Sequence, residues 1–208
     1  MPTIEEQKYL KDVVRWEQVN SHSREKGTLA KSDTSISLGQ VLGRDRKAIT
    51  NFAQDSGSNL TESDVSLGPD AQKGDYEIHG TGSDEGHVVD PDGYRRESFN
   101  SLPYDGDHLR ISDSGSISDG DKYTVTVGDG SGKFVALDPS AVDGGQEAHG
   151  ISLDYYDTTK RDVPGVVLVR DSEVIKSGLE WPDGISPEQK SKALAELRRL
   201  GVVVREEV

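Results

Sequence analysis

The stretch GVVLVRDSEVIKSGLEWPDGISPEQKSKALAELRRLGVVVREEV, residues 165–208, decides the fold. It opens with a short apolar run rich in β-branched residues, Val166–Val169, which is typical of a strand covered on both faces. Proline and glycine then interrupt the pattern at Trp181–Gly184, as they do in turns. This part of the chain therefore predicts a buried strand, a polar crossover and a turn.

A helix is expected next. Ser186 and Gln189 have the spacing of a capping box, and Pro187 stands at the first helical position, which proline favours. Apolar residues then recur at helical spacing and form one stripe: Ala193, Leu194, Leu197 and Leu200. The pattern predicts an amphipathic helix that begins just after Ser186.

The end of that helix is equally clear. Arg198 and Arg199 lie in the expected last turn, where the helix dipole favours cations. Gly201 is placed to end the helix in a left-handed conformation. The run Val202–Val204 then predicts a further strand.

Composition limits the class of protein. Only 32% of the 208 residues are hydrophobic, so the core is modest, and 23 glycines favour turns and short strands. The chain has no cysteine, which excludes disulfides, thiolate metal sites and cysteine nucleophiles. It has no run of 18 apolar residues and no signal-peptide core, so we expect a soluble protein without a membrane partner.

The chain is strongly acidic, with a net charge of −14 from 38 Asp and Glu against 24 Lys and Arg. The acidic residues are spread along the chain, which argues against a nucleic-acid partner, because such a partner needs a basic face. Two interpretations of this acidity remain open. It keeps the protein soluble through self-repulsion, or it reflects a halophilic, high-salt environment.

Residues 1–20 read as a separate segment. Thr3 and Glu6 have capping-box spacing, and apolar residues follow at roughly helical intervals. These residues are Ile4, Tyr9, Leu10, Val13 and Val14, with Trp16 as a further apolar anchor. The pattern predicts a short amphipathic helix, or an arm that becomes ordered only on a partner.

The middle of the chain looks like an inserted all-β module, residues 45–127. Alternating segments with turn signals between them predict a small sandwich or barrel, similar to the immunoglobulin-like modules of virion surfaces. The expected strands are Asp75–His79, Gly86–Asp90, His108–Ser112 and Lys122–Val127. Residues 45–73 are rich in Ser, Asp and Gly and are expected to form a loose edge or linker.

No motif identifies an active site or a metal site. The acidic turns at Asp90–Gly93, Asp105–Asp107 and Asp119–Asp121 are best explained as plain β-turns, since none matches a full EF-hand loop. His79, His87 and His108 could meet in space, but scattered histidines are the simpler interpretation. The chain has no GxSxG elbow and no Walker loop, so we expect no catalytic residue, no metal and no cofactor.

Three short motifs in order carry a family resemblance: VLGR at 41–44, KFVALDP within 133–139 and GLEWPDGIS at 178–186. Residues 21–44 together with 128–208 resemble the head decoration proteins of lambda-like tailed viruses. The resemblance implies an α+β, mainly β fold, namely a small mixed core with one C-terminal helix. The segment 45–127 would interrupt a hairpin of that core as a sandwich-like insertion.

The resemblance implies a structural function without catalysis. Such a protein would form a homotrimer on the outer surface of a virion capsid, after synthesis in the host cytoplasm, and bind the major capsid protein. Residues 1–20 would contact the shell through Tyr9, Leu10, Val13, Val14 and Trp16. Residues that would support the trimer or the core are Trp181, Pro182, Leu194 and Leu197.

Two alternatives come from other classes. A surface or secreted carbohydrate-binding module would need exposed aromatic residues in a cleft. The candidates in the insertion are Tyr76, Tyr94, Phe99 and Tyr104. A hydrolase with a Ser-His-Asp triad is the weaker alternative, because triads are defined by geometry and not by spacing.

Overall fold

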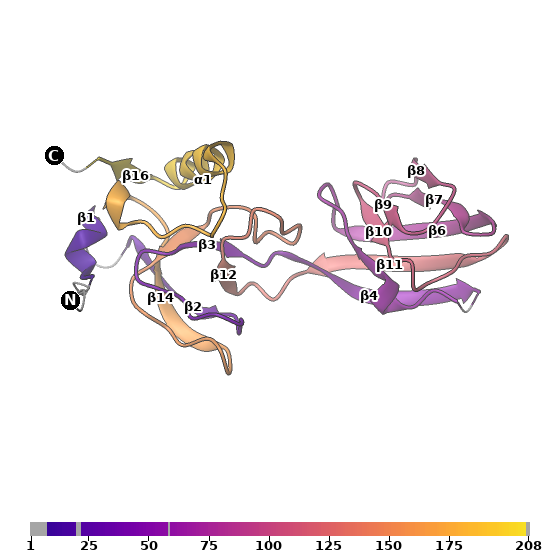
Figure 1. The fold of residues 1–208 in the computed structure, drawn as a ribbon, viewed down its shortest axis with the longest axis horizontal. Coiled ribbons are helices and arrows are strands. Elements are labelled where there is room, and N and C mark those ends of the chain that lie inside the picture. The colour runs from indigo at the N-terminus through magenta and orange to yellow at the C-terminus, as the bar shows by residue number, and fades with distance from the viewer. Residues whose placement is uncertain (1–7, 20–21, 58, 207–208) are drawn as a thin grey trace, which may run out of the picture. The chain divides into compact units, whose positions relative to one another are not determined.

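The computed structural model describes residues 8–19, 22–57 and 59–206, and the chain folds into two compact units (Figure 1). The discontinuous unit consists of the chain up to Asp45 and the chain from Lys133 onward. The inserted unit is the continuous segment Arg46–Gly132. The amide N of Asp45 donates to the carbonyl O of Lys133 at 3.0 Å, so the chain leaves and re-enters the discontinuous unit at adjacent points.

The discontinuous unit contains a closed five-stranded barrel. Its strands, in order around the barrel, are β12 (Phe134–Ala136), β2 (Arg24–Leu29), β14 (Val163–Leu168), β13 (Gly150–Ser152) and β3 (Val41–Arg44). Strands β3 and β12 pair antiparallel with Arg44 opposite Phe134, as the sequence predicts for the two strands of one hairpin. A closed barrel has no free strand edge, so this part of the unit offers no site for strand addition.

A second sheet of the same unit has three strands in the order β1 (Val14–Glu17), β15 (Ser172–Ile175) and β16 (Val202–Arg205). β1 pairs antiparallel with β15, and β15 pairs parallel with β16. Parallel neighbours need a crossover connection. Here the crossover contains α1 (Pro187–Arg199), the one α-helix among the described residues.

The ends of α1 form as the sequence predicts. Ser186 Oγ accepts a hydrogen bond from Gln189 N at 3.2 Å, and Gln189 Oε1 accepts one from Ser186 N at 2.9 Å. Gly201 follows the helix with φ +82°, the left-handed conformation that glycine adopts without a steric penalty. The helix buries its apolar stripe against the three-stranded sheet and the barrel, in a core cluster that includes Val13, Val174, Leu197 and Val202.

In the part that the structure describes, the regular elements of the inserted unit are strands and one 3₁₀ turn, Glu62–Asp64. Its larger sheet has the order β4 (Lys47–Ser56), β11 (Lys122–Asp129), β6 (Gly74–Gly82), β7 (Glu85–Val89) and β8 (Arg95–Phe99). Its smaller sheet has the order β5 (Val65–Leu67), β10 (Leu109–Ile111) and β9 (Tyr104–Asp105). Stacked rings join the two sheets, for example Phe99 and Tyr104 with centroids 4.9 Å apart.

The fold class predicted from the sequence is confirmed: the protein is mainly β, with one C-terminal helix and a sandwich-like all-β insertion. Two local predictions are wrong. The expected loose edge within 45–73 contains β4, a ten-residue strand whose register comes from pairing with β11. Residues 128–132, which the sequence assigns to the core, group with the inserted unit, because β11 continues to pair as far as Asp129.

The amphipathic helix expected in residues 1–20 is also wrong for the part that the structure describes. Residues Leu10–Asp12 form a single 3₁₀ turn, and Val14–Glu17 form strand β1. The proposed capping residues Thr3 and Glu6 lie outside the described residues. Residues 14–17 form a strand because β15 provides a partner for them. No local sequence pattern predicts that partner.

Candidate functional site

The structure separates the apolar residues that the sequence grouped near the N-terminus. Val13 is fully buried in the core of the discontinuous unit, and Leu10 and Val14 are half-buried against the same core. Tyr9 and Trp16 are 57% and 54% exposed. Of the members of this group that the structure describes, only Tyr9 and Trp16 therefore present most of their surface to a partner; Ile4 lies outside the described residues.

Close backbone contact holds this segment in place. A Cβ atom on Gly178 would lie 2.1 Å from Asp12 O and 2.9 Å from Val13 Cα, so only glycine fits there. Ile175 N also donates to Val13 O at 2.9 Å. The segment 10–17 is thus an integral part of the discontinuous unit rather than a detached arm.

The outer face of the three-stranded sheet carries one row of side chains: Trp16 on β1, Glu173 on β15 and Val203 on β16 are cross-strand neighbours. Glu173 lies between two arginines, with Arg15 Nε at 3.4 Å and Arg205 Nε at 3.7 Å. Trp16 and Val203 also line a hollow of about 300 Å³ on this face. This surface, which we call the outer face, combines exposed apolar groups with paired charges, as protein interfaces do.

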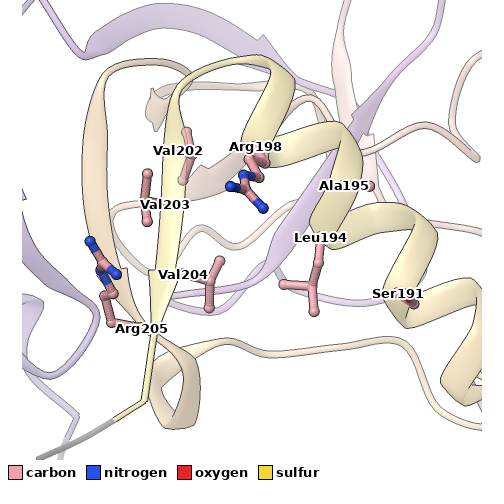
Figure 2. Close-up of a pocket in the computed structure, with 8 residues that line it drawn as sticks. All are labelled: Ser191, Leu194, Ala195, Arg198, Val202, Val203, Val204 and Arg205. Carbon is pink, nitrogen blue, oxygen red and sulfur yellow. The ribbon is translucent and has the colours of Figure 1, made fainter.

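A second hollow of about 570 Å³ lies between α1 and β16 (Figure 2). Leu194, Ala195 and Arg198 line it from the helix, and residues Val202–Arg205 line it from the strand. In Figure 2, Leu194 and Val204 lie on opposite sides of the space between the helix and the strand. We call this hollow the α1–β16 groove.

The residues expected to support a trimer or the core have different positions. Leu197 is fully buried in the core, whereas Leu194 is half-buried and lines the α1–β16 groove. Trp181 packs partly against the core, with Lys190 Nζ 4.8 Å from the centroid of its ring, and Pro182 next to it is half-buried. Of the four, only Leu197 is fully buried.

The inserted unit uses its polar residues for its own structure. Glu97 accepts hydrogen bonds from Tyr104 Oη at 2.7 Å, Asp107 N at 2.8 Å and His108 Nδ1 at 2.9 Å. Burial alone would raise the pKa of Glu97, but the hydrogen bonds from His108 and Tyr104 outweigh it and lower that pKa. The Glu97 carboxylate on β8 therefore binds both β9 and the residues just before β10.

The three histidines of the insertion do not meet. His79 and His87 stack with centroids 5.0 Å apart, while His108 pairs with Glu97. The carboxylate of Asp90 is engaged by protein donors in its turn, with Tyr94 N at 2.8 Å and Arg96 Nε at 2.5 Å. Among the residues that the structure describes, no three His, Asp or Glu side chains are grouped so that they could hold a metal ion.

The aromatic residues considered for carbohydrate binding are mostly inside the insertion. Tyr76 is fully buried, Phe99 is 7% exposed and Tyr104 is hydrogen-bonded to Glu97. Tyr94 alone of the four is well exposed. A sugar ring therefore finds no platform of several aromatic faces among these residues. Within the described ranges, no helix has the length and apolarity needed to cross a bilayer.

The sequence pattern missed the α1–β16 groove. It identified Arg198 as a cation at the helix C-terminus and Val202–Val204 as a strand, and both features exist. The strand order places this strand at a sheet edge, with the helix beside it. No local motif predicts this arrangement.

Comparison with known proteins identifies a family. Residues 3–202 match the family described as bacteriophage lambda head decoration protein D. No curated protein matches the chain. A crystal structure of FlgL from Xanthomonas campestris matches 53% of this chain at 14% identity with a TM-score of 0.24, too low to carry an argument. The chain spans about a third of that protein. Since the family match covers nearly the whole chain, in both units, this protein belongs to the bacteriophage lambda head decoration protein D family.

Proposed function

We propose that this protein decorates the outer surface of a tailed-phage capsid and stabilises the shell by bridging neighbouring capsomers as a homotrimer. The observation that carries the proposal is the family match across residues 3–202. The family is a structural, non-enzymatic one, and its members belong to the capsid of the virion.

The outer face supports the shell-binding part of the proposal. Trp16, Val203 and the hollow between them offer apolar surface on a rigid sheet, and Tyr9 and Val19 add exposed apolar groups in the same N-terminal segment. Exposed aromatic anchors are the residues that most often dominate binding energy. We therefore assign shell contact to Tyr9 and Trp16, and we assign Val13 to the core.

Cooperation between many copies supports the stabilising part. A single clamp across a capsomer seam needs only modest affinity, since many clamps on one shell act together. An acidic chain with a net charge of −14 also has little tendency to bind packaged DNA. These properties suit a protein that binds the shell from outside.

The test uses expanded phage shells that lack the decoration protein. We expect the purified protein to bind them saturably and to raise the temperature at which they rupture. We expect native mass spectrometry of the free or shell-bound protein to show a trimer. The absence of shell binding at micromolar concentration would contradict the proposal, and a protein that is monomeric both free and on shells would contradict its trimer.

A further inference from the structure

Strand β16 has an open main-chain edge. Among the strands that the structure describes it has one partner, β15, and it ends the three-stranded sheet. The parallel register, together with the hydrogen bond from Ser172 N to Gly201 O at 3.1 Å, directs the main-chain groups of Val203 and Arg205 towards β15. Those of Val202 and Val204 therefore point away from the sheet, and their amides have no main-chain partner among the described residues.

The α1–β16 groove lies along this open edge. Four consecutive residues, Val202–Arg205, line it. Successive side chains of a strand point to opposite faces, so a hollow that all four residues line must run along the main-chain edge itself. On its other side the groove is lined by α1, with Leu194, Ala195 and Arg198. An edge strand beside a helix is the arrangement in which an extended peptide adds a strand and places alternate side chains in pockets.

The charges of the groove indicate what kind of peptide fits. Among the described residues that line it, the ionisable ones are Arg198 and Arg205, although the chain as a whole is strongly acidic. Arg198 is exposed, and in the described part of the chain it has no ion pair. Arg205 has one long contact, to Glu173 at 3.7 Å. A carboxylate in the bound peptide would complement Arg198, and an apolar side chain would fit between Leu194 and Val204.

We propose that the α1–β16 groove binds an extended, acidic segment of the capsid shell protein, which adds to the open edge of β16 as a fourth strand. The segment carries an apolar residue that packs between Leu194 and Val204 and a carboxylate that pairs with Arg198. This inference rests on the proposed function and adds to it a second attachment point, at the sheet edge opposite β1. Two attachment points on one sheet hold the protein in a defined orientation on the shell.

The charge of the groove is tested with a matched pair of variants. Arg198→Glu reverses the charge that lines the groove, and Arg199→Glu reverses the neighbouring exposed charge, which does not line it. Both changes affect the helix dipole equally, so their effects on folding should match. We expect Arg198→Glu to weaken binding to expanded shells about tenfold or more at low salt, and Arg199→Glu to change it less than about twofold.

The main-chain edge is tested with Val204→Pro. Proline removes an amide that faces the open edge and leaves the hydrogen bonds to β15 intact, so the edge position tolerates it. We expect a native circular dichroism spectrum with binding to shells weakened about tenfold, because strand addition derives its affinity from main-chain hydrogen bonds. If this variant does not fold, the comparison of Arg198→Glu with Arg199→Glu decides whether the groove binds the shell protein.

The outcomes separate this inference from the proposed function. Wild-type binding to shells together with equal binding by Arg198→Glu and Arg199→Glu overturns the groove assignment and leaves the proposed function standing. Failure of the wild-type protein to bind shells overturns both. If Arg198→Glu instead changes the oligomeric state in native mass spectrometry, the groove binds a second copy of the chain, and its assignment to the shell protein is wrong.

Discussion

Single residues decide how the N-terminal segment joins the core. Val13 is buried in the core cluster, and Gly178 lets the main chain of residues 12 and 13 approach closely. Trp16, three residues after Val13, is more than half exposed. Apolar neighbours in one short segment therefore have opposite roles, because Val13 ends the 3₁₀ turn and lies in the core, whereas Trp16 lies in β1 beyond a register shift and is exposed.

The variants Val13→Ala and Trp16→Ala separate these roles. Val13→Ala removes buried methyl groups and should lower the free energy of unfolding by about 2 kcal/mol. Trp16→Ala should change it by less than about 0.5 kcal/mol, while weakening binding to shells. Denaturant unfolding measures the free energy of unfolding of both variants. Both tryptophans report on Val13→Ala, and Trp181 reports on Trp16→Ala. Equal destabilisation by the two variants would contradict the assignment.

In the inserted unit, Asp64 gives a residue-scale prediction for pH. Its carboxylate accepts hydrogen bonds from Ser114 Oγ at 2.5 Å and Thr61 Oγ1 at 2.6 Å, and these bonds lower its pKa to about 2. The unfolded chain has an aspartate pKa of about 3.9, so the folded state favours the ionised form. Asp64 therefore stabilises the inserted unit above about pH 4, and this contribution is lost as the pH falls towards 2.

Asp64→Asn should remove that pH dependence. We expect a loss on the order of 1 kcal/mol at pH 7 that shrinks to a small fraction of this value at pH 2, where about half of the wild-type carboxylates in the folded state are protonated. Amide hydrogen exchange of residues in β5 and β10 measures the stability of the inserted unit alone. The matched change Asp119→Asn, in an exposed turn, should leave the exchange unchanged. A constant difference between Asp64→Asn and wild type across this pH range would show that ionisation of Asp64 does not matter.

At the scale of elements, α1 is defined by adjacent residues, whereas β1 depends on a strand that lies far away in the chain. Residues between Ser186 and Gly201 define the start of the helix, its apolar stripe and its end. β1 has four residues and no boundary signal, and it becomes a strand because β15 provides a register for it. Removal of β1 therefore changes the fold of the discontinuous unit, not merely a contact with a partner.

A truncated protein that begins at Gln18 tests this. It lacks β1 and the buried Val13, so we expect its free energy of unfolding to fall by more than the effect of Val13→Ala, that is by more than about 2 kcal/mol. The fluorescence of Trp181 in a denaturant titration measures the loss. A shorter truncation that begins at Lys8 removes none of the described elements and serves as the control. Wild-type stability of the protein that begins at Gln18 would show that the N-terminal segment acts only in binding.

At the scale of the whole molecule, two units share one chain. The inserted unit has its own sheets and buried residues, and its connections reach the discontinuous unit where Asp45 N bonds Lys133 O. Insertions at such hairpin positions are tolerated because they require few changes in the host fold. The surfaces that we assign to shell binding, namely the outer face and the α1–β16 groove, belong entirely to the discontinuous unit.

Replacement of residues 46–132 by Asn-Gly should therefore leave a folded protein that still binds shells. Asn-Gly forms the tight turn that joins two antiparallel strands, and β3 and β12 are already paired. We expect shell affinity within about twofold of wild type, since no proposed contact is removed. Circular dichroism and shell sedimentation provide the measurements. A folded protein that no longer binds would place the insertion in the shell interface.

The sequence by itself determined the elements whose signals lie within a few residues. The capping box at Ser186, the left-handed Gly201, the valine-rich strands and four strands of the insertion could all be predicted, because the backbone and adjacent side chains define them. The family resemblance also rests on such short motifs in order. The fold class followed from these elements together.

Only the tertiary structure decided which strands pair, which edges stay open and which apolar residues are buried. β1 and β4 gain their registers from β15 and β11, which lie far away in the chain. Val13 and Trp16 are both apolar residues of one short segment, but Val13 is fully buried before β1 begins and Trp16 is 54% exposed on β1. The open edge of β16 and its groove with α1 likewise depend on strand order, which is set by the burial of the whole apolar surface and not by any local pattern.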